Sequence, residues 1–247
     1  FAAAAALVSP RGVGAAGGGV LSLLMFTAGL CSFSRAAWAG LLSGAVLMAL
    51  LVRRLGTAAA RRRGALLLAA AGAVTVLFVI PGGPLARRDG ESPIGRAASV
   101  TALGSKKVAD RFYLWAQTLP LALRRPVTGY GPDTFAAVFP QEWDERRRQL
   151  WGPAPRIIDR AHNDTLDTLM SVGVLGLAAY WWIIVSALRG GLRAARAGGE
   201  DALWGIAAVS ALTAYLLTLQ FGFSVVSVAP VFWSAVGAAR AWERPAP

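Results

Sequence analysis

Long apolar runs restrict how this chain can fold more than any other feature. A helix needs about 20 mostly apolar residues to cross the hydrocarbon core of a bilayer. Six stretches approach that length, namely residues 13–31, 36–52, 64–80, 166–188, 202–219 and 221–239. Backbone inside lipid must bond to itself, which favours helices. The sequence predicts an all-α polytopic integral membrane protein with about six transmembrane helices, the last two joined in a tight hairpin.

Composition agrees with a membrane protein. Hydrophobic residues make up 55% of the 247 residues and charged residues only 15%, a combination that is rare in soluble domains. The net charge of +12 would suggest nucleic-acid binding in a soluble chain. Here most arginines fall between the apolar runs, where they set orientation and contact anionic lipid, so nucleic acid is excluded as a partner. The single Cys31 is expected to be a small buried packing residue.

The distribution of arginines predicts which side of the membrane each loop faces, because short arginine-rich loops stay in the cytoplasm. Such loops hold Arg53, Arg54, Arg61, Arg62, Arg63, Arg189, Arg193, Arg196, Arg240 and Arg244. With alternating spans, all of them share the cytoplasmic side of the inner membrane with the C-terminus. We therefore expect transmembrane helices with an outward Ser-Arg turn in 1–81, an extracytoplasmic loop in 82–163, and C-terminal transmembrane helices in 164–247.

The long loop is expected to contain short amphipathic helices. Residues 97–123 carry an apolar stripe at helical spacing, which suits a helix lying along the membrane surface. The stripe consists of Val108, Phe112, Trp115 and Leu119. The following "RRPVTGYGPDTF" breaks the helix, and Asp133 or Thr134 is placed to cap a new one. Gly129 and Gly131 permit close approach of the backbone to a ligand, although a plain turn is the commoner reason for such glycines.

His162 is the only histidine of the chain and lies just before the apolar run at 166–188. The next three residues, Asn163, Asp164 and Thr165, are candidate caps for that helix. A lone histidine is more often solvated or packed than catalytic. One histidine and one distant cysteine make no recognisable metal-ligand set, although carboxylates bind hard cations.

Arg35, in "CSFSRAAW", lies between two predicted spans. An arginine at that depth marks either a functional charge or a side chain reaching the headgroups, and the sequence leaves both open. Arg111, Arg124 and Arg125 are predicted on the same side of the membrane. Guanidinium groups match phosphate oxygens, so these residues are candidates to meet a doubly charged group such as a lipid diphosphate.

Three segments in order carry a family resemblance: "SFSRAAWAGLL", "DRFYLWAQTLPLALRRPVTGYGPDTF" and "RAHNDTLDTLMSVGVLGLAAY". Together they resemble the C-terminal core of the O-antigen ligase and polymerase superfamily over about residues 21–180. The resemblance implies an enzyme that moves a glycan from a polyprenyl-diphosphate carrier to a glycan, lipid or protein acceptor outside the cytoplasmic membrane. It implies no metal and no other cofactor.

The resemblance also implies roles for individual residues. Arg35 matches the arginine of the Ser-Arg motif, and Arg111 matches that of the Arg-x-x-x-Trp stretch ending at Trp115; both are expected to bind the diphosphate. Arg125 is a further candidate for substrate binding. Gly129 and Gly131 match a Gly-x-Gly turn among the substrate-binding residues. His162 and Asn163 match a His-Asn pair in which the histidine activates the acceptor.

One position departs from the family pattern. Where relatives often carry Glu-x-Gly-x-x-Gly, this chain has "SVGVLG", with Ser171 in place of the acid. Asp164 and Asp167 are candidates to support His162 instead, since a nearby carboxylate orients an imidazole. They are equally well explained as solvated charges that suit the start of a helix.

The expected chemistry follows from the leaving group. A sugar on a diphosphate needs charge stabilisation, which arginines supply, and a base for the attacking hydroxyl, which an imidazole supplies. Back-side attack predicts inversion at the anomeric carbon. A non-catalytic homologue, favoured by Ser171, and an anion transporter lined by arginines are the alternatives. Ligase, polymerase and protein oligosaccharyltransferase activities are not separated by the sequence.

Overall fold

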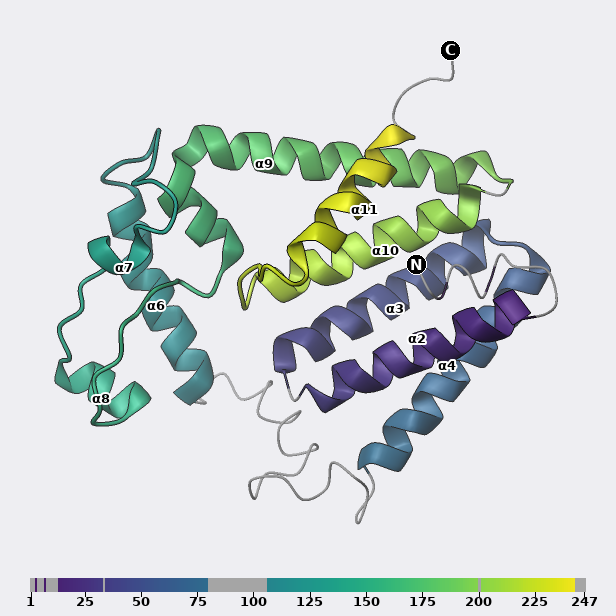
Figure 1. The fold of residues 1–247 in the computed structure, drawn as a ribbon, viewed down its shortest axis with the longest axis horizontal. Coiled ribbons are helices and arrows are strands. Elements are labelled where there is room, and N and C mark those ends of the chain that lie inside the picture. Colours follow the sequence, from purple (N-terminus) through teal and green to yellow (C-terminus); the bar gives the residue numbers. More distant parts are fainter. Residues whose placement is uncertain are drawn as a thin grey trace. The chain divides into compact units, whose positions relative to one another are not determined.

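The computed structural model describes residues 3, 7, 13–32, 34–79, 106–199 and 201–242. Within those ranges the regular structure is helical and contains no strand, so the all-α prediction is confirmed (Figure 1). The longer elements are α2 (Val13–Cys31), α3 (Arg35–Leu55), α4 (Ala58–Val79), α6 (Lys106–Ala122), α9 (Asp164–Ala197), α10 (Asp201–Leu219) and α11 (Ala229–Ala241). Two short helices, α7 (Phe135–Val138) and α8 (Glu145–Trp151), lie between α6 and α9.

Four of the described helices are long and apolar enough to cross a membrane: α2, α3, α9 and α10. The chain therefore has the helices of a membrane protein, while the total of about six spans stays a prediction. The last expected span is corrected, because α11 begins at Ala229 rather than at 221 and has 13 residues, about 20 Å. Pro230 fits the first turn of this helix. Residues 220–228 separate α10 from α11, so the connection between these two helices is longer than the tight turn that the sequence predicts.

The chain divides into two compact units. The first unit comprises Phe1–Arg96, Ile183–Thr218 and Ser227–Pro247, and the second comprises Ala97–Trp182 and Leu219–Val226. This division follows packing. The division predicted from the sequence, at 81 and 163, concerns membrane topology and stays a prediction.

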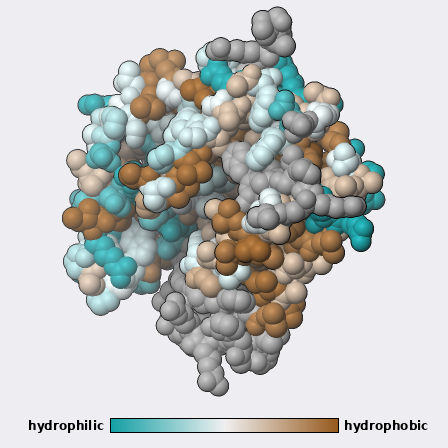
Figure 2. Space-filling model, turned by 45° about the vertical axis from the view of Figure 1, so that its right-hand side comes forward, coloured by the Kyte–Doolittle hydropathy of each residue, from teal (hydrophilic) through white to brown (hydrophobic). Residues whose placement is uncertain are grey.

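The first unit is held together by close approach of helix backbones. In α3, a Cβ added to Gly40 would overlap Thr218 Oγ1 and lie 2.7 Å from the carbonyl oxygen of Ala214 in α10. One turn later, a Cβ on Gly44 would lie 2.7 Å from Ala214 Cβ. Small residues at helix contacts are typical of membrane bundles, where lipid offers no hydrophobic drive for association. Much apolar surface of this unit is exposed, and Figure 2 shows it in brown. Cys31 is exposed at the end of α2, so the prediction of a buried packing residue was wrong.

The second unit has a separate hydrophobic core beneath α6. Its buried members are Leu114, Leu121, Ala122, Phe135, Phe139, Ile158, Ala161 and Met170. The predicted stripe is divided, because Phe112 and Leu119 are 55% and 45% exposed whereas Trp115 packs against this core. Residues 97–105 of the predicted surface helix fall outside the described residues. Contact of the stripe with a membrane stays a prediction.

Helix α9 is broken at Gly173, which has φ 65° and ψ −170°. The break leaves backbone groups of α9 without partners in their own helix, and these groups form hydrogen bonds with the turn after α6. The Tyr130 N–H donates to the Met170 carbonyl at 2.8 Å, and the Gly131 N–H donates to that of Ser171 at 2.9 Å. The Val174 N–H donates to the Pro126 carbonyl at 2.7 Å. The run predicted at 166–188 as one helix is therefore two helical segments joined by a sharp bend (Figure 1).

Candidate active site around His162

His162 has a left-handed backbone, with φ 55°, which non-glycine residues rarely adopt. The residue before it is fixed from two helices. The Ala161 N–H donates to Asp167 Oδ1 of α9 at 2.7 Å, and Trp115 Nε1–H of α6 donates to the Ala161 carbonyl at 3.1 Å. Because Ala161 is fully buried, both of its polar groups need these partners. The two bonds fix the peptides that flank Ala161 and so the backbone position of His162.

The imidazole is half-buried, and its centroid lies 5.3 Å from that of the Phe223 ring. Arg160 contacts the same phenylalanine, with its guanidinium carbon 5.4 Å from the ring centroid. Arg160 also pairs with Asp133 at 3.1 Å. The segment 219–226, distant in sequence, thus forms part of the surroundings of His162 within the second unit.

The electrostatic surroundings keep His162 uncharged. Burial, followed by the positive charge of Arg111, lowers the pKa of His162 from 6.5 to about 4. Arg160 lowers it further, while the negative charge of Asp159 acts in the opposite direction. At neutral pH the ring is therefore a neutral imidazole with a nitrogen available to accept a proton.

Asn163 caps α9, as its position in the sequence predicts. Its Oδ1 accepts the Leu166 N–H at 3.0 Å, the bond expected of an N-cap residue. Its Nδ2 donates to the Gln220 carbonyl at 3.1 Å, and Thr165 Oγ1 donates to Gln220 Oε1 at 3.1 Å. The start of α9 is thereby tied to segment 219–226. A substrate contact of Asn163 stays a prediction.

The two candidate carboxylates have different partners. Asp164 Oδ2 accepts the Tyr180 hydroxyl at 3.1 Å, and the carboxylate also accepts the Ser224 N–H. Asp167 Oδ1 accepts the hydrogen bond from the Ala161 N–H, directly before His162. Its other oxygen, Oδ2, is buried and has no hydrogen-bond partner among the described residues. Within the part of the chain that the structure describes, neither carboxylate bonds to the imidazole. Asp167 therefore positions His162 through Ala161.

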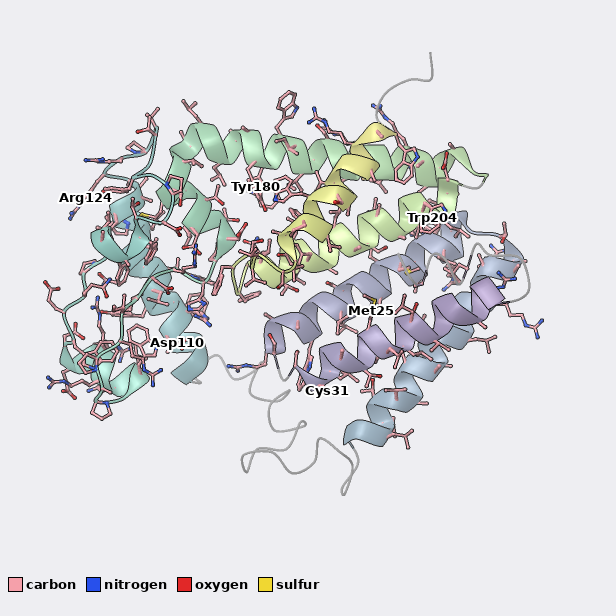
Figure 3. The ribbon with its side chains drawn as sticks, in the orientation of Figure 1. Met25, Cys31, Asp110, Arg124, Tyr180 and Trp204 are labelled. Carbon is pink, nitrogen blue, oxygen red and sulfur yellow. The ribbon has the colours of Figure 1, made fainter. Side chains whose placement is uncertain are left out.

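Tyr180 was not identified from the sequence as a site residue. It lies 16 residues after Asp164, a separation of about 24 Å along a straight helix. The break at Gly173 turns the chain so that the hydroxyl reaches the carboxylate. Figure 3 labels Tyr180 on the long part of α9, after the bend. The pair of Asp164 and Tyr180 can be identified only when the break in α9 is known. A glycine by itself does not predict such a break, because glycine is frequent in membrane helices.

The glycines of the predicted Gly-x-Gly turn lie against α9. Gly129 has φ 67°, and a Cβ there would lie 2.6 Å from the Met170 carbonyl oxygen. Gly131 has φ 103° and bonds to Ser171. Ser171, which replaces the acid of the family pattern, thus contributes its carbonyl to the pairing of the two backbones. This pairing accounts for both glycines, and their contact with a substrate stays a prediction.

The predicted arginines are distributed between the units. Arg111 is half-buried in α6 and acts on the charge of His162. Arg125 is exposed, with its guanidinium carbon 5.0 Å above the Tyr130 ring. Arg124 is also exposed and extends outward in Figure 3. Arg35 is the first residue of α3 in the first unit, after Ser34, whose hydroxyl accepts the Ala37 N–H at 3.3 Å.

The structure thus brings together His162, Arg111, Asn163, Asp164 and Asp167 in the second unit. Arg160, Tyr180, Gln220 and Phe223 were not identified from the sequence, and only the fold gives them contacts with this group. The described residues contain no cluster of three or more His, Cys, Asp or Glu able to hold a metal ion.

The chain matches a model of a known protein family. The family model described as O-antigen ligase matches residues 20–181. No curated protein and no solved structure matches the chain. The matched range contains Arg35, α6 and the turn with Gly129 and Gly131. It also contains His162 and the first part of α9 with its break at Gly173.

Proposed function

This chain belongs to the O-antigen ligase family, and from that premise we propose that it is an inverting, metal-independent glycosyltransferase. It moves a glycan from a polyprenyl-diphosphate carrier to an acceptor hydroxyl on the extracytoplasmic face of the inner membrane. The observation that carries this proposal is a neutral imidazole at His162, on a fixed backbone and within the field of Arg111.

In the proposed reaction, the acceptor oxygen forms a bond to the anomeric carbon of the glycan while the bond from that carbon to the diphosphate oxygen breaks. His162 takes the proton of the acceptor hydroxyl. The diphosphate leaves with its negative charge stabilised by arginine. Attack from the face opposite the leaving group inverts the anomeric configuration.

The low pKa of His162 fits a general base that becomes stronger when the donor binds. A base works best when its pKa is near the working pH, and a pKa of about 4 is too low for the strongest effect. Arg111, whose positive charge helps to lower this pKa, is also a proposed contact for phosphate. A bound diphosphate would offset the charge of Arg111 and raise the pKa of His162. The imidazole would thus become a stronger base once the donor is present.

The other residues divide into contacts with the donor and supports for His162. Arg111, Arg35 and Arg125 are the proposed diphosphate ligands. Trp115 and Asp167 support the His162 backbone through Ala161, and Asp164 with Tyr180 supports the start of α9. Gly129, Gly131 and Asn163 shape the surroundings in which the acceptor binds.

The test uses membranes that contain the protein, a labelled polyprenyl-diphosphate oligosaccharide and extracted envelope acceptors. His162→Asn removes the base, while asparagine tolerates the left-handed backbone better than most residues do. We expect a loss of transfer of roughly 100-fold to 10,000-fold, with unchanged thermal unfolding. Arg148→Gln, an exposed arginine of α8, is the control and retains transfer. Full activity of His162→Asn would contradict the proposal, and product of retained configuration would contradict inversion.

A further inference from the structure

The first unit contains a cavity of about 540 Å³ among α2, α3, α4 and α10. Small residues on these helices leave the space, among them Gly44, Ala49, Gly64, Ala71 and Ala211. Leu23, Met25, Phe26, Leu41, Met48 and Leu68 supply larger apolar side chains. The volume falls in the usual range for sites that hold small organic ligands.

The lining offers a ligand almost no polar group along the helices. Two hydroxyls line the cavity, and each already bonds to its own helix. Ser22 Oγ donates to the Gly18 carbonyl at 2.7 Å, and Ser210 Oγ donates to the Ile206 carbonyl at 2.8 Å. This part of the cavity therefore suits a hydrocarbon chain rather than a sugar.

Arg53 and Arg61 complete the lining where α3 ends and α4 begins. Arg61 Nη1 donates to the Arg53 carbonyl at 3.3 Å, which holds the two residues together. Both are exposed, and a guanidinium has five donors. The cavity thus combines an apolar body with a pair of cations at one end.

The first unit has few acids to neutralise these cations. Its described residues include one acid, Asp201, at the start of α10. They include ten arginines, namely Arg35, Arg53, Arg54, Arg61, Arg62, Arg63, Arg189, Arg193, Arg196 and Arg240. No ion pair of Arg53 or Arg61 occurs among the described residues. An external anion is therefore favoured at this end of the cavity.

We propose that this cavity binds one anionic phospholipid, with an acyl chain among α2, α3, α4 and α10 and its phosphate on Arg53 and Arg61. Basic pockets between membrane helices on the cytoplasmic side recognise anionic headgroups in this way. The arginine-rich connection from α3 to α4 is on that side in the proposed topology. The site is separate from the proposed transfer chemistry and does not depend on it.

The test titrates the purified, delipidated full chain in detergent with phosphatidylglycerol or phosphatidylcholine and counts bound lipid by native mass spectrometry. We expect one phosphatidylglycerol per chain, bound more tightly than phosphatidylcholine. Replacing both Arg53 and Arg61 by glutamine should weaken phosphatidylglycerol binding about thirtyfold, which corresponds to about 2 kcal/mol for two basic residues. The matched control replaces Arg54 and Arg62, exposed arginines outside the lining, and changes the affinity less than about threefold.

A second pair of variants tests the apolar part. Ala71 lines the cavity and Ala69 does not, so Ala71→Phe should abolish saturable binding while Ala69→Phe retains it, with thermal unfolding recorded for both. Equal binding of the two phospholipids would overturn the proposal. So would an unchanged affinity in the Arg53/Arg61 variant, or displacement of phosphatidylglycerol by a lower concentration of a polyprenyl phosphate. That last result would assign the cavity to the tail of a glycan donor.

Discussion

In the first unit, the hydroxyls of Ser22, Thr27 and Thr75 each donate to a carbonyl four residues earlier in the same helix. In the second unit, Trp115 bonds to a residue 46 positions away and Asn163 to one 57 positions away. The first unit depends mainly on close backbones and apolar contact, with a few long-range side-chain bonds such as that of Thr218 to the Ala36 carbonyl. The second unit fixes irregular backbone with individual polar side chains. Replacement of one polar side chain should therefore affect the second unit far more than the first.

The largest effect is expected from Gly173→Ala. The φ/ψ values of Gly173 lie in a region nearly exclusive to glycine, and a Cβ would overlap the Val127 backbone. The free energy of unfolding should fall by about 3 kcal/mol or more, measured by thermal unfolding in detergent and by proteolysis of the second unit. Gly72→Ala is the control, since nothing lies within 4 Å of that site and helix propensity favours alanine. Equal free energies of unfolding for the two variants would contradict the break of α9 at Gly173.

A smaller loss is expected from Gly40→Ala, which tests packing in the first unit. The new methyl group would overlap Thr218 Oγ1 and press on α10, so the stability should fall by about 2 kcal/mol, as for other overpacked contacts. Gly17→Ala, with open space around it, should be neutral or stabilising. Differential scanning fluorimetry of the two variants is the measurement. An unchanged stability of Gly40→Ala would mean that α3 and α10 pack less closely in solution than in the structure.

Trp115→Phe should lower stability by about 1–3 kcal/mol, because it leaves the buried Ala161 carbonyl without its donor. Glycan transfer should also fall, since the backbone before His162 loses one of its two supports. Ser210→Ala is the counterpart in the first unit, where the hydroxyl bonds only to its own helix, and should change stability by less than about 1 kcal/mol. The measurements are thermal unfolding curves and glycan-transfer rates for both variants. Similar losses of stability in Trp115→Phe and Ser210→Ala would contradict the difference between the two units.

The smallest effect is expected from pH. His162 has a pKa of about 4 in the folded protein and 6.5 as its ordinary value, so the unfolded chain binds the proton first as pH falls. The stability from the neutral ring is present above about pH 6.5 and is lost as the pH falls towards about 4. Solvent screening of the half-exposed ring keeps the effect small. The melting temperature of wild type should fall more than that of His162→Asn over this window. Equal falls would contradict the lowered pKa.

The sequence predicted the features that depend on local pattern. Apolar length located the helices that became α2, α3, α9 and α10, and the Asn163 side chain caps α9 as its position suggests. The one histidine was identified together with Arg111, whose charge acts on it. These features follow from residue type and spacing along a single segment.

The features that were missed depend on pairing between distant segments. Gly173 resembles any glycine of a membrane helix until Pro126 and Tyr130 are seen to bond beside it. Tyr180 meets Asp164 only because of that break. The last helix was placed too early because Phe221 and Phe223 are apolar. In the structure they contact Trp115 and His162 rather than extending α11.

The exchange of backbone bonds between residues 126–131 and 170–174 has a consequence for biosynthesis. The ribosome completes the glycine turn about 40 residues before it completes the break that the turn must pair with. In the proposed topology this loop must cross the membrane, and until it has done so the backbone groups at the break of α9 lack their partners. In that topology the environment of His162 is assembled only after translocation of the loop. A chain held before that step would carry the histidine without its supporting backbone.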